Sequence, residues 1–181
     1  MKRIVFVGGS HCGKTTLLEH YQAAGYPVIP EAAMFIMTQL KDELGLEQYR
    51  DWRSRNTQEF FNRVCEKQIE LEQNAPVQSQ ILFLDRGVPD MIAISGYHGG
   101  TPSRHILDYP KTHRYDAVFL CELLDHFDDR PETGRMHTRE DSRKIVELVY
   151  EEYHKYGYRP IRLGPSSVEE RIRIIDQTLG L

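Results

Sequence analysis

The chain reads Gly8-Gly9-Ser10-His11-Cys12-Gly13-Lys14-Thr15 immediately after the apolar run Ile4-Val5-Phe6-Val7. This order fits the pattern G-x-x-x-x-G-K-[ST], in which a glycine-rich loop joins a buried strand to a helix and cradles phosphate groups. The glycines allow successive backbone N–H groups to turn inward around the phosphates, and the N-terminus of the following helix adds a favourable dipole. An ordinary glycine turn between a strand and a helix is the alternative. The pattern predicts a phosphate-binding loop.

The residues of this loop have distinct predicted roles. We expect Lys14 to reach the β- and γ-phosphates of a nucleotide, and the Thr15 hydroxyl to hold Mg²⁺. Because Cys12 lies close to Lys14 and to a helix start, we expect the pKa of its thiol to be lowered. The predicted nucleotide-binding residues are Gly8, Gly9, Ser10, His11, Cys12, Gly13, Lys14, Thr15 and Thr16.

Composition narrows the class of protein. The chain has 181 residues, of which 40% are hydrophobic, and this supplies the core of one domain that we expect to span residues 1–181. A net charge of −4 argues against binding to duplex nucleic acid or to an anionic membrane. Cys12, Cys65 and Cys121 lack the spacing of a metal site or of a secreted disulfide framework, so we expect reduced thiols in a cytoplasmic protein. The oligomeric state stays open.

Short apolar runs alternate along the chain with amphipathic helical segments. This alternation predicts an α/β fold of the P-loop NTPase type, with a mainly parallel five-stranded sheet, helices on both faces and a lid. The charged link around Trp52 and the section that holds Gly96, Gly99 and Pro110 are expected to be irregular. The predicted strands are 2–7, 28–30, 80–84, 117–120 and 159–163, and the predicted helices are 13–24, 31–44, 57–74, one opened by a capping box at 138–141 and one capped at 166–169.

Charged residues follow the ends of two predicted strands. Because ligands of parallel α/β folds bind beyond the carboxyl ends of the strands, we expect Glu31, Asp85 and Arg86 to share a cleft with the loop. Asp85 can hold Mg²⁺ directly or through water, or accept the proton of a substrate hydroxyl; a helix cap or a structural ion pair is the alternative. Arg86 can clamp a phosphate or pair with Asp85. Glu31 can bind substrate hydroxyls or act as an acid at a helix N-terminus.

Taken together, these segments resemble a known family, the small-molecule kinase-like P-loop domains grouped with the ribosylnicotinamide kinase domain and described as AAA-type ATPases. The aspartate-arginine pair is also similar to that of nucleoside and nucleotide kinases. One position departs from the pattern, because such proteins commonly carry arginine where this chain has Met34. The segments that carry the resemblance are Gly8–Thr16, Val28–Ala33, Gln68–Glu70, Phe83–Asp90, Gly134-Arg135 and Tyr153–Tyr158.

The resemblance implies phosphoryl transfer from ATP, as co-substrate, to a small acceptor of nucleoside or nucleotide type, with Mg²⁺ as cofactor. It also implies that adenine lies beside Gly164-Pro165-Ser166. The residue chemistry agrees, because phosphoryl transfer needs positioning and charge neutralisation more than covalent catalysis. A regulatory ATPase switch without a small-molecule acceptor is the alternative function.

A charged segment at about 125–139 is the predicted lid. It mixes arginines and carboxylates with Pro131 and Gly134, which prevent long regular structure. Arg135 and Arg130 are the arginines that we expect to neutralise the transferred phosphoryl group, beside the catalytic residues Lys14, Asp85 and Arg86. Pairing with neighbouring carboxylates is the alternative for each lid arginine.

Overall fold

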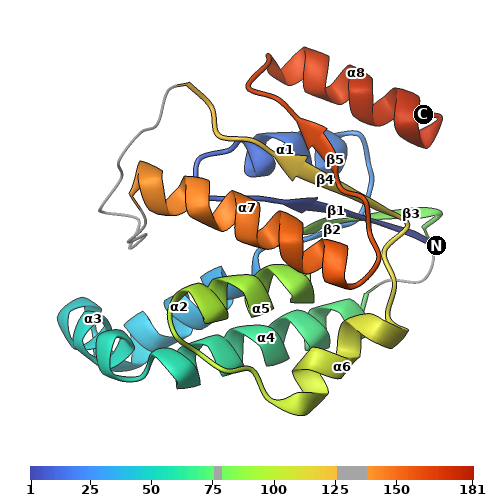
Figure 1. Cartoon of the computed structure of the whole chain (residues 1–181). Coiled ribbons are helices and arrows are strands. Elements are labelled where there is room, and N and C mark those ends of the chain that lie inside the picture. The colour runs from blue at the N-terminus through green and yellow to red at the C-terminus, as the bar shows by residue number, and fades with distance from the viewer. Residues whose placement is uncertain (76–78, 126–137) are drawn as a thin grey trace.

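Five parallel strands form a sheet at the centre of the molecule (Figure 1). The computed structural model describes residues 1–75, 79–125 and 138–181. The strands run in the order β2-β3-β1-β4-β5, so the strand that leads into the glycine-rich loop is the central one. The strands are β1 (Lys2–Val7), β2 (Val28–Ile29), β3 (Ile81–Asp85), β4 (Ala117–Cys121) and β5 (Ile161–Leu163). The predicted parallel α/β fold is therefore confirmed.

Helices cover both faces of the sheet, because alternate residues of each central strand point to opposite faces. Ile4 and Phe6 pack in one core with α1 and α8, whereas Val5 and Val7 pack in a second core with α2, α4, α5 and α7 (Figure 1). The described helices are α1 (Lys14–Ala23), α2 (Ala32–Leu44), α3 (Leu46–Arg55), α4 (Thr57–Gln73), α5 (Val88–Tyr97), α6 (Arg104–Thr112), α7 (Arg139–Lys155) and α8 (Val168–Leu179).

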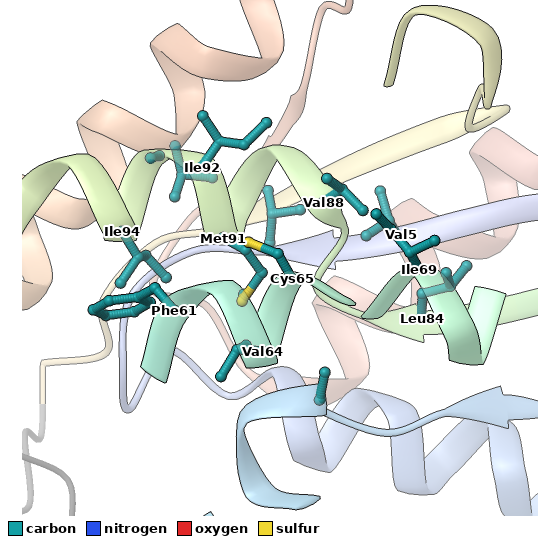
Figure 2. Packing of buried hydrophobic residues seen from close by; sticks show 14 of the residues in the cluster. Val5, Phe61, Val64, Cys65, Ile69, Leu84, Val88, Met91, Ile92 and Ile94 are labelled. Carbon is teal, nitrogen blue, oxygen red and sulfur yellow. The ribbon is translucent and has the colours of Figure 1, made fainter. Parts of the chain in front are cut away.

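The second core is built where α4 and α5 cross the sheet. Figure 2 shows Cys65 of α4 and Met91 of α5 between the two helices, with Val5 and Leu84 of the sheet close by. Each of these four side chains is at most 2% exposed. Burial of this kind contributes about 25 cal/mol for each Å² of apolar surface removed from water. The packing fixes the position of α5, which is joined to the end of β3 by Arg86 and Gly87.

The structure corrects one prediction in the segment that follows α2. The link around Trp52 was expected to be irregular, but it forms helix α3. Tyr49 is the one residue of α3 that is buried, so the helix has almost no apolar stripe for periodicity to detect. The helix is held instead by its packing on α2 and α4.

A second correction concerns the section after Asp85. It was expected to be rich in loops, but it forms α5 and α6. Residues Val88 to Ser95 of α5 are all buried, so the helix has no polar face and its sequence lacks the amphipathic period. In α6, Pro110 lies in the last turn, close to the end of the helix at Thr112. His98 is the C-cap of α5, and Gly99, with a φ of 76°, comes next and ends the helix, as glycine commonly does at this position.

Side-chain caps define the starts of the last two helices. Thr138 Oγ1 accepts a hydrogen bond from the backbone N–H of Asp141 at 3.1 Å, and Asp141 Oδ2 accepts one from the backbone N–H of Thr138 at 2.9 Å. Ser167 caps α8 through the backbone N–H of Glu170. Both predicted caps are confirmed. Among the described residues, no helix is both long enough and apolar enough to span a bilayer.

Candidate functional site

The glycine-rich loop lies at the carboxyl end of β1, and its backbone packs closely against β4 and α7. Gly8 has a φ of 135°, and a Cβ added there would lie 2.5 Å from the carbonyl oxygen of Cys121 in β4. A Cβ at Gly9 would lie 2.6 Å from the carbonyl oxygen of Ser142 in α7. Side-chain atoms do not fit at these distances, so glycine is required for the loop backbone to approach both elements.

Lys14 is the first residue of α1, and its ammonium group is turned back into the loop. Nζ donates a hydrogen bond to the carbonyl oxygen of Gly9 at 2.7 Å, and it lies 3.3 Å from Cys12 Sγ. The residue is only 7% exposed. A cation held this deeply against the loop backbone is suited to neutralising phosphate charge, because a partly desolvated site strengthens electrostatic attraction.

The pKa of the Cys12 thiol is lowered well below its ordinary value, which confirms the sequence prediction. The largest cause is a hydrogen bond with the thiol of Cys121, followed by the positive charges of Lys14 and Arg86, and burial opposes them. The sequence indicated the contribution of Lys14. It carried no signal for Cys121, which comes from the neighbouring strand β4.

Asp85 ends β3, opposite Phe6 of β1 in the register of the sheet. The residue is 6% exposed, and its Oδ1 has no hydrogen-bond partner within the described parts of the chain. Burial raises the pKa of Asp85 to about 6, and the negative charge of Glu31 acts in the same direction. The positive charges of Lys14 and Arg86 partly offset both effects. A buried carboxylate oxygen without a partner is costly unless a ligand or a metal ion meets it.

The predicted Mg²⁺ ligands fit the way in which proteins hold this ion. Mg²⁺ usually takes one or two protein ligands and completes its shell with water and substrate phosphates. Within residues 1–75, 79–125 and 138–181 no group of three or more histidine, cysteine, aspartate or glutamate side chains is placed to hold a metal. The unpartnered Oδ1 of Asp85 and the exposed Thr15 in the first turn of α1 are consistent with a site of the sparse kind.

Arg86 follows Asp85 with a φ of 72° and is 5% exposed. Its Nε donates to Glu31 Oε1 at 2.9 Å, and its Nη1 donates to the carbonyl oxygen of Gly8 at 2.6 Å and to Asp90 Oδ1 at 3.4 Å. Burial works against the guanidinium charge, but Glu31 and Asp90 outweigh it and raise the pKa of Arg86. Among the described residues its ion pairs are with Glu31 and Asp90, and Asp85, which was the alternative to phosphate as a partner, acts on Arg86 through a smaller electrostatic contribution.

Glu31 and Asp90 anchor Arg86 from two different elements. Glu31 lies at the N-terminus of α2 without a side-chain cap, and its carboxylate turns toward Arg86. Asp90 in α5 is fully buried, and its Oδ2 accepts hydrogen bonds from the backbone N–H of Gly87 and from the Tyr153 hydroxyl at 2.7 Å. Arg86 also contacts the loop through Gly8, so the structure brings Glu31, Asp85 and Arg86 to the loop, as predicted.

Two predicted catalytic residues lie outside the described residues. Arg130 and Arg135 fall within 126–137, as does most of the predicted lid at 125–139. The lid and its arginines stay predictions. Their flanks are described: Asp125 follows β4 and Thr138 caps α7.

A separate groove of about 1140 Å³ lies between α2 and α4. Phe35 and Arg63 are among its lining residues, and no residue of the glycine-rich loop lines it. Neither Asp85 nor Arg86 lines the groove, but Pro30, the neighbour of Glu31, does.

Sequence and structure comparisons relate the chain to known proteins. A family model described as an AAA domain matches residues 3–171. No curated protein matches. The fold is similar to a crystal structure of NadR protein in complex with NAD and AMP-PNP, with a TM-score of 0.64, and to one of NadR protein in complex with NR, with a TM-score of 0.66.

In both comparisons the sequence identity is 14%, and the alignment covers 99% of this chain and 50% of the solved chain. The chain therefore spans about half the length of these two proteins. At this identity the similarity concerns the fold. The matches confirm the family resemblance inferred from the sequence motifs.

Proposed function

The chain belongs to the AAA domain family, and from this premise we propose that it is a phosphotransferase that moves the γ-phosphoryl group of ATP to a small-molecule acceptor. The observation that carries the proposal is the buried carboxylate of Asp85. Its Oδ1 lacks a partner among the described residues, and it lies within electrostatic range of Lys14, whose ammonium group is held inside the loop. A cation and a carboxylate oxygen without a described partner, both at the carboxyl ends of neighbouring strands, are groups that phosphoryl transfer uses.

The donor half of the site consists of the glycine-rich loop and Lys14. Backbone N–H groups of residues 8–16 would bind the phosphates, and Lys14 would neutralise the β- and γ-phosphates. Thr15 and Asp85 would hold Mg²⁺, which when bound neutralises the charge that develops on the transferred group. In the sequence-based proposal, Arg130 and Arg135 of the lid would approach the same group.

The acceptor half lies on the β2–β3 side of the loop. Glu31 follows β2 and Asp85 ends β3, so their carboxylates flank the position from which an acceptor hydroxyl would approach. With a pKa of about 6, Asp85 is ionised at pH 7.5 and can either accept the hydroxyl proton or ligate the metal ion. Glu31 is 16% exposed on its side chain and retains access to solvent while it pairs with Arg86.

Similarity to the two NadR structures supports this proposal at the level of the fold. One of these structures is described in complex with NAD and AMP-PNP. The other is described in complex with NR. We propose that this chain likewise binds ATP and an acceptor of nucleoside or nucleotide type. A regulatory ATPase switch that uses the same loop without an acceptor is the competing function.

A panel of acceptors tests the proposal. Purified protein is incubated with Mg-ATP and with nucleosides, nucleotides and ribosylated vitamins, and release of ADP is measured for each. We expect one acceptor class to stimulate ADP release. ADP release that no acceptor changes, but that a protein partner stimulates, would favour the switch. Well-folded protein that binds no Mg-nucleotide would refute both functions.

The Asp85→Asn variant, measured with the same panel of acceptors, tests whether Asp85 acts as the base or as a metal ligand. The variant should lose about 10²- to 10⁴-fold in acceptor-dependent turnover, the range for a general base, and should still bind ATP. Asp108→Asn is the matched control, because Asp108 lies in α6 with an exposed side chain that pairs with Lys111. The control should turn over normally. Near-normal turnover of Asp85→Asn would rule Asp85 out as base and as metal ligand.

A further inference from the structure

Arg171 of α8 is a buried arginine that donates hydrogen bonds to three backbone carbonyl oxygens of the described residues. Its Nη1 donates to Cys12 at 2.6 Å, its Nε to Gly164 at 2.8 Å and its Nη2 to Glu122 at 3.1 Å. The residue is 2% exposed. A planar guanidinium presents its donors in a rigid fork, so these bonds fix three backbone segments relative to one another.

The three carbonyl groups belong to segments that follow three neighbouring strands. Cys12 lies in the loop after β1, Glu122 comes directly after β4, and Gly164 comes directly after β5. These strands are adjacent in the sheet in the order β1-β4-β5. A ligand whose phosphates occupy the loop and whose remainder extends away from Asp85 would therefore meet the other two segments in turn.

In the part of the chain that the structure describes, no carboxylate pairs with Arg171. Within the described residues its acceptors are carbonyl oxygens, whereas Arg86 pairs with Glu31 and Asp90. The carboxylate of Glu122 pairs with Arg162 instead. Burying a cation without a counter-charge is unfavourable for stability, so packing is a poor reason for placing arginine here. The guanidinium lies against the loop, because its Nη1 would be 3.2 Å from a Cβ added at Gly13, so a polyphosphate bound in the loop would bring negative charge close to it.

We propose that Arg171 is the positioning residue of the donor half of the site, holding the phosphate loop at a fixed spacing from the segments after β4 and β5, so that one nucleoside triphosphate meets all three at once. This role rests on the proposed function. It predicts a specific coupling: contacts made to the triphosphate and contacts made to the nucleoside reinforce each other only while Arg171 holds the segments in register.

Arg171→Lys separates this role from packing and from charge. Lysine keeps the positive charge but cannot make three divergent hydrogen bonds from a planar fork. Arg173→Lys is the matched control, because Arg173 is two residues further along α8, is 56% exposed on its side chain and pairs with Glu170. Binding of Mg-ATP and of magnesium tripolyphosphate, which lacks the nucleoside, is measured by calorimetry for wild type and both variants.

We expect Arg171→Lys to weaken Mg-ATP binding by roughly tenfold more than tripolyphosphate binding, within the usual range of coupling between sites. Partial unfolding lowers both affinities by the same factor, so the ratio of the two affinities reports positioning. The control should keep the wild-type ratio. An unchanged ratio in Arg171→Lys, whether through normal binding or through equal losses, would overturn the proposal. Wild-type protein that binds neither ligand would instead refute the proposed function, and the positioning role with it.

A measurement on the wild type covers the case in which Arg171→Lys does not fold. Hydrogen exchange is followed in peptides that contain residues 9–14 and 164–170, with and without tripolyphosphate. Tripolyphosphate would occupy the loop and not residues 164–170, and Arg171 joins these two segments by hydrogen bonds, so added protection in the second peptide reports their coupling. We expect protection to increase in both peptides. Protection confined to residues 9–14 would show that the segments are not coupled and would overturn the role of Arg171.

Discussion

Replacing Asp85 by asparagine is expected to make the protein more stable while it removes the chemistry. The residue is 6% exposed, and burial together with the charge of Glu31 raises the pKa of its carboxyl from 3.8 to about 6. The difference corresponds to about 3 kcal/mol of free energy by which the folded state disfavours the ionised form. Asparagine is neutral and close in shape to the protonated carboxyl, so at pH 8 we expect a gain of about 2 to 3 kcal/mol in the free energy of unfolding.

The pH dependence of this gain has a definite sign. Between pH 3.8 and 6 the folded state binds the proton of Asp85 more tightly than the unfolded state does, so wild-type stability falls as pH rises through this window. Above about pH 7 the wild-type penalty is complete. The advantage of Asp85→Asn should therefore be largest at pH 7 to 8 and should approach zero near pH 4.

Urea unfolding followed by circular dichroism at pH 4, 6 and 8 measures the difference between the two proteins. Asp108→Asn is the control, because the pKa of Asp108 is shifted in the opposite direction. A hydrogen bond from Lys111 lowers it. That control should bring no gain at any pH. A gain for Asp85→Asn that is absent at pH 8, or that is the same at pH 4 and pH 8, would refute the assignment of a buried, destabilised charge to Asp85.

Three further substitutions test the supports of the site by urea unfolding. Arg86→Met should lower the free energy of unfolding by about 3 to 5 kcal/mol, because it leaves carboxylates buried without their cation. The loss should shrink as the pH falls and these carboxylates become protonated. A loss that does not change with pH would contradict this explanation. Thr138→Ala should cost about 1 kcal/mol by removing the cap of α7, and an unchanged midpoint would show that the cap is dispensable. Gly9→Ala should cost about 1 to 3 kcal/mol, because its Cβ would lie 2.6 Å from the carbonyl oxygen of Ser142. Its control is Gly96→Ala, which meets no atom within 4 Å and should be neutral or stabilising.

Much of the fold could be predicted because strands and amphipathic helices leave a local record in the sequence. The run Gln80 to Leu84 predicted a buried strand, and the strand is Ile81–Asp85. Thr138 and Asp141 predicted the start of α7, because a capping box is formed by residues three apart. By contrast, α5 is buried on every side and α3 on almost none, so neither shows a helical period even though both are helices.

The same division holds within the candidate site. Short-range spacing was enough to predict the glycine-rich loop and Lys14, because the requirements of a phosphate-binding loop fall on consecutive residues. Asp85 was predicted from its place at the end of an apolar strand, where ligands of parallel α/β folds bind. The partners of Arg86 and the contacts of Arg171 had no such signal. Apart from Asp90, which is near Arg86 in the sequence, and Gly164, which is near Arg171, those side chains meet groups that are distant in the sequence. Whichever elements the packing brings within about 3 Å become the partners of a buried charge. Burial and the neighbouring Glu31 likewise set the pKa of Asp85, and both exist only once the strands and helices have assembled.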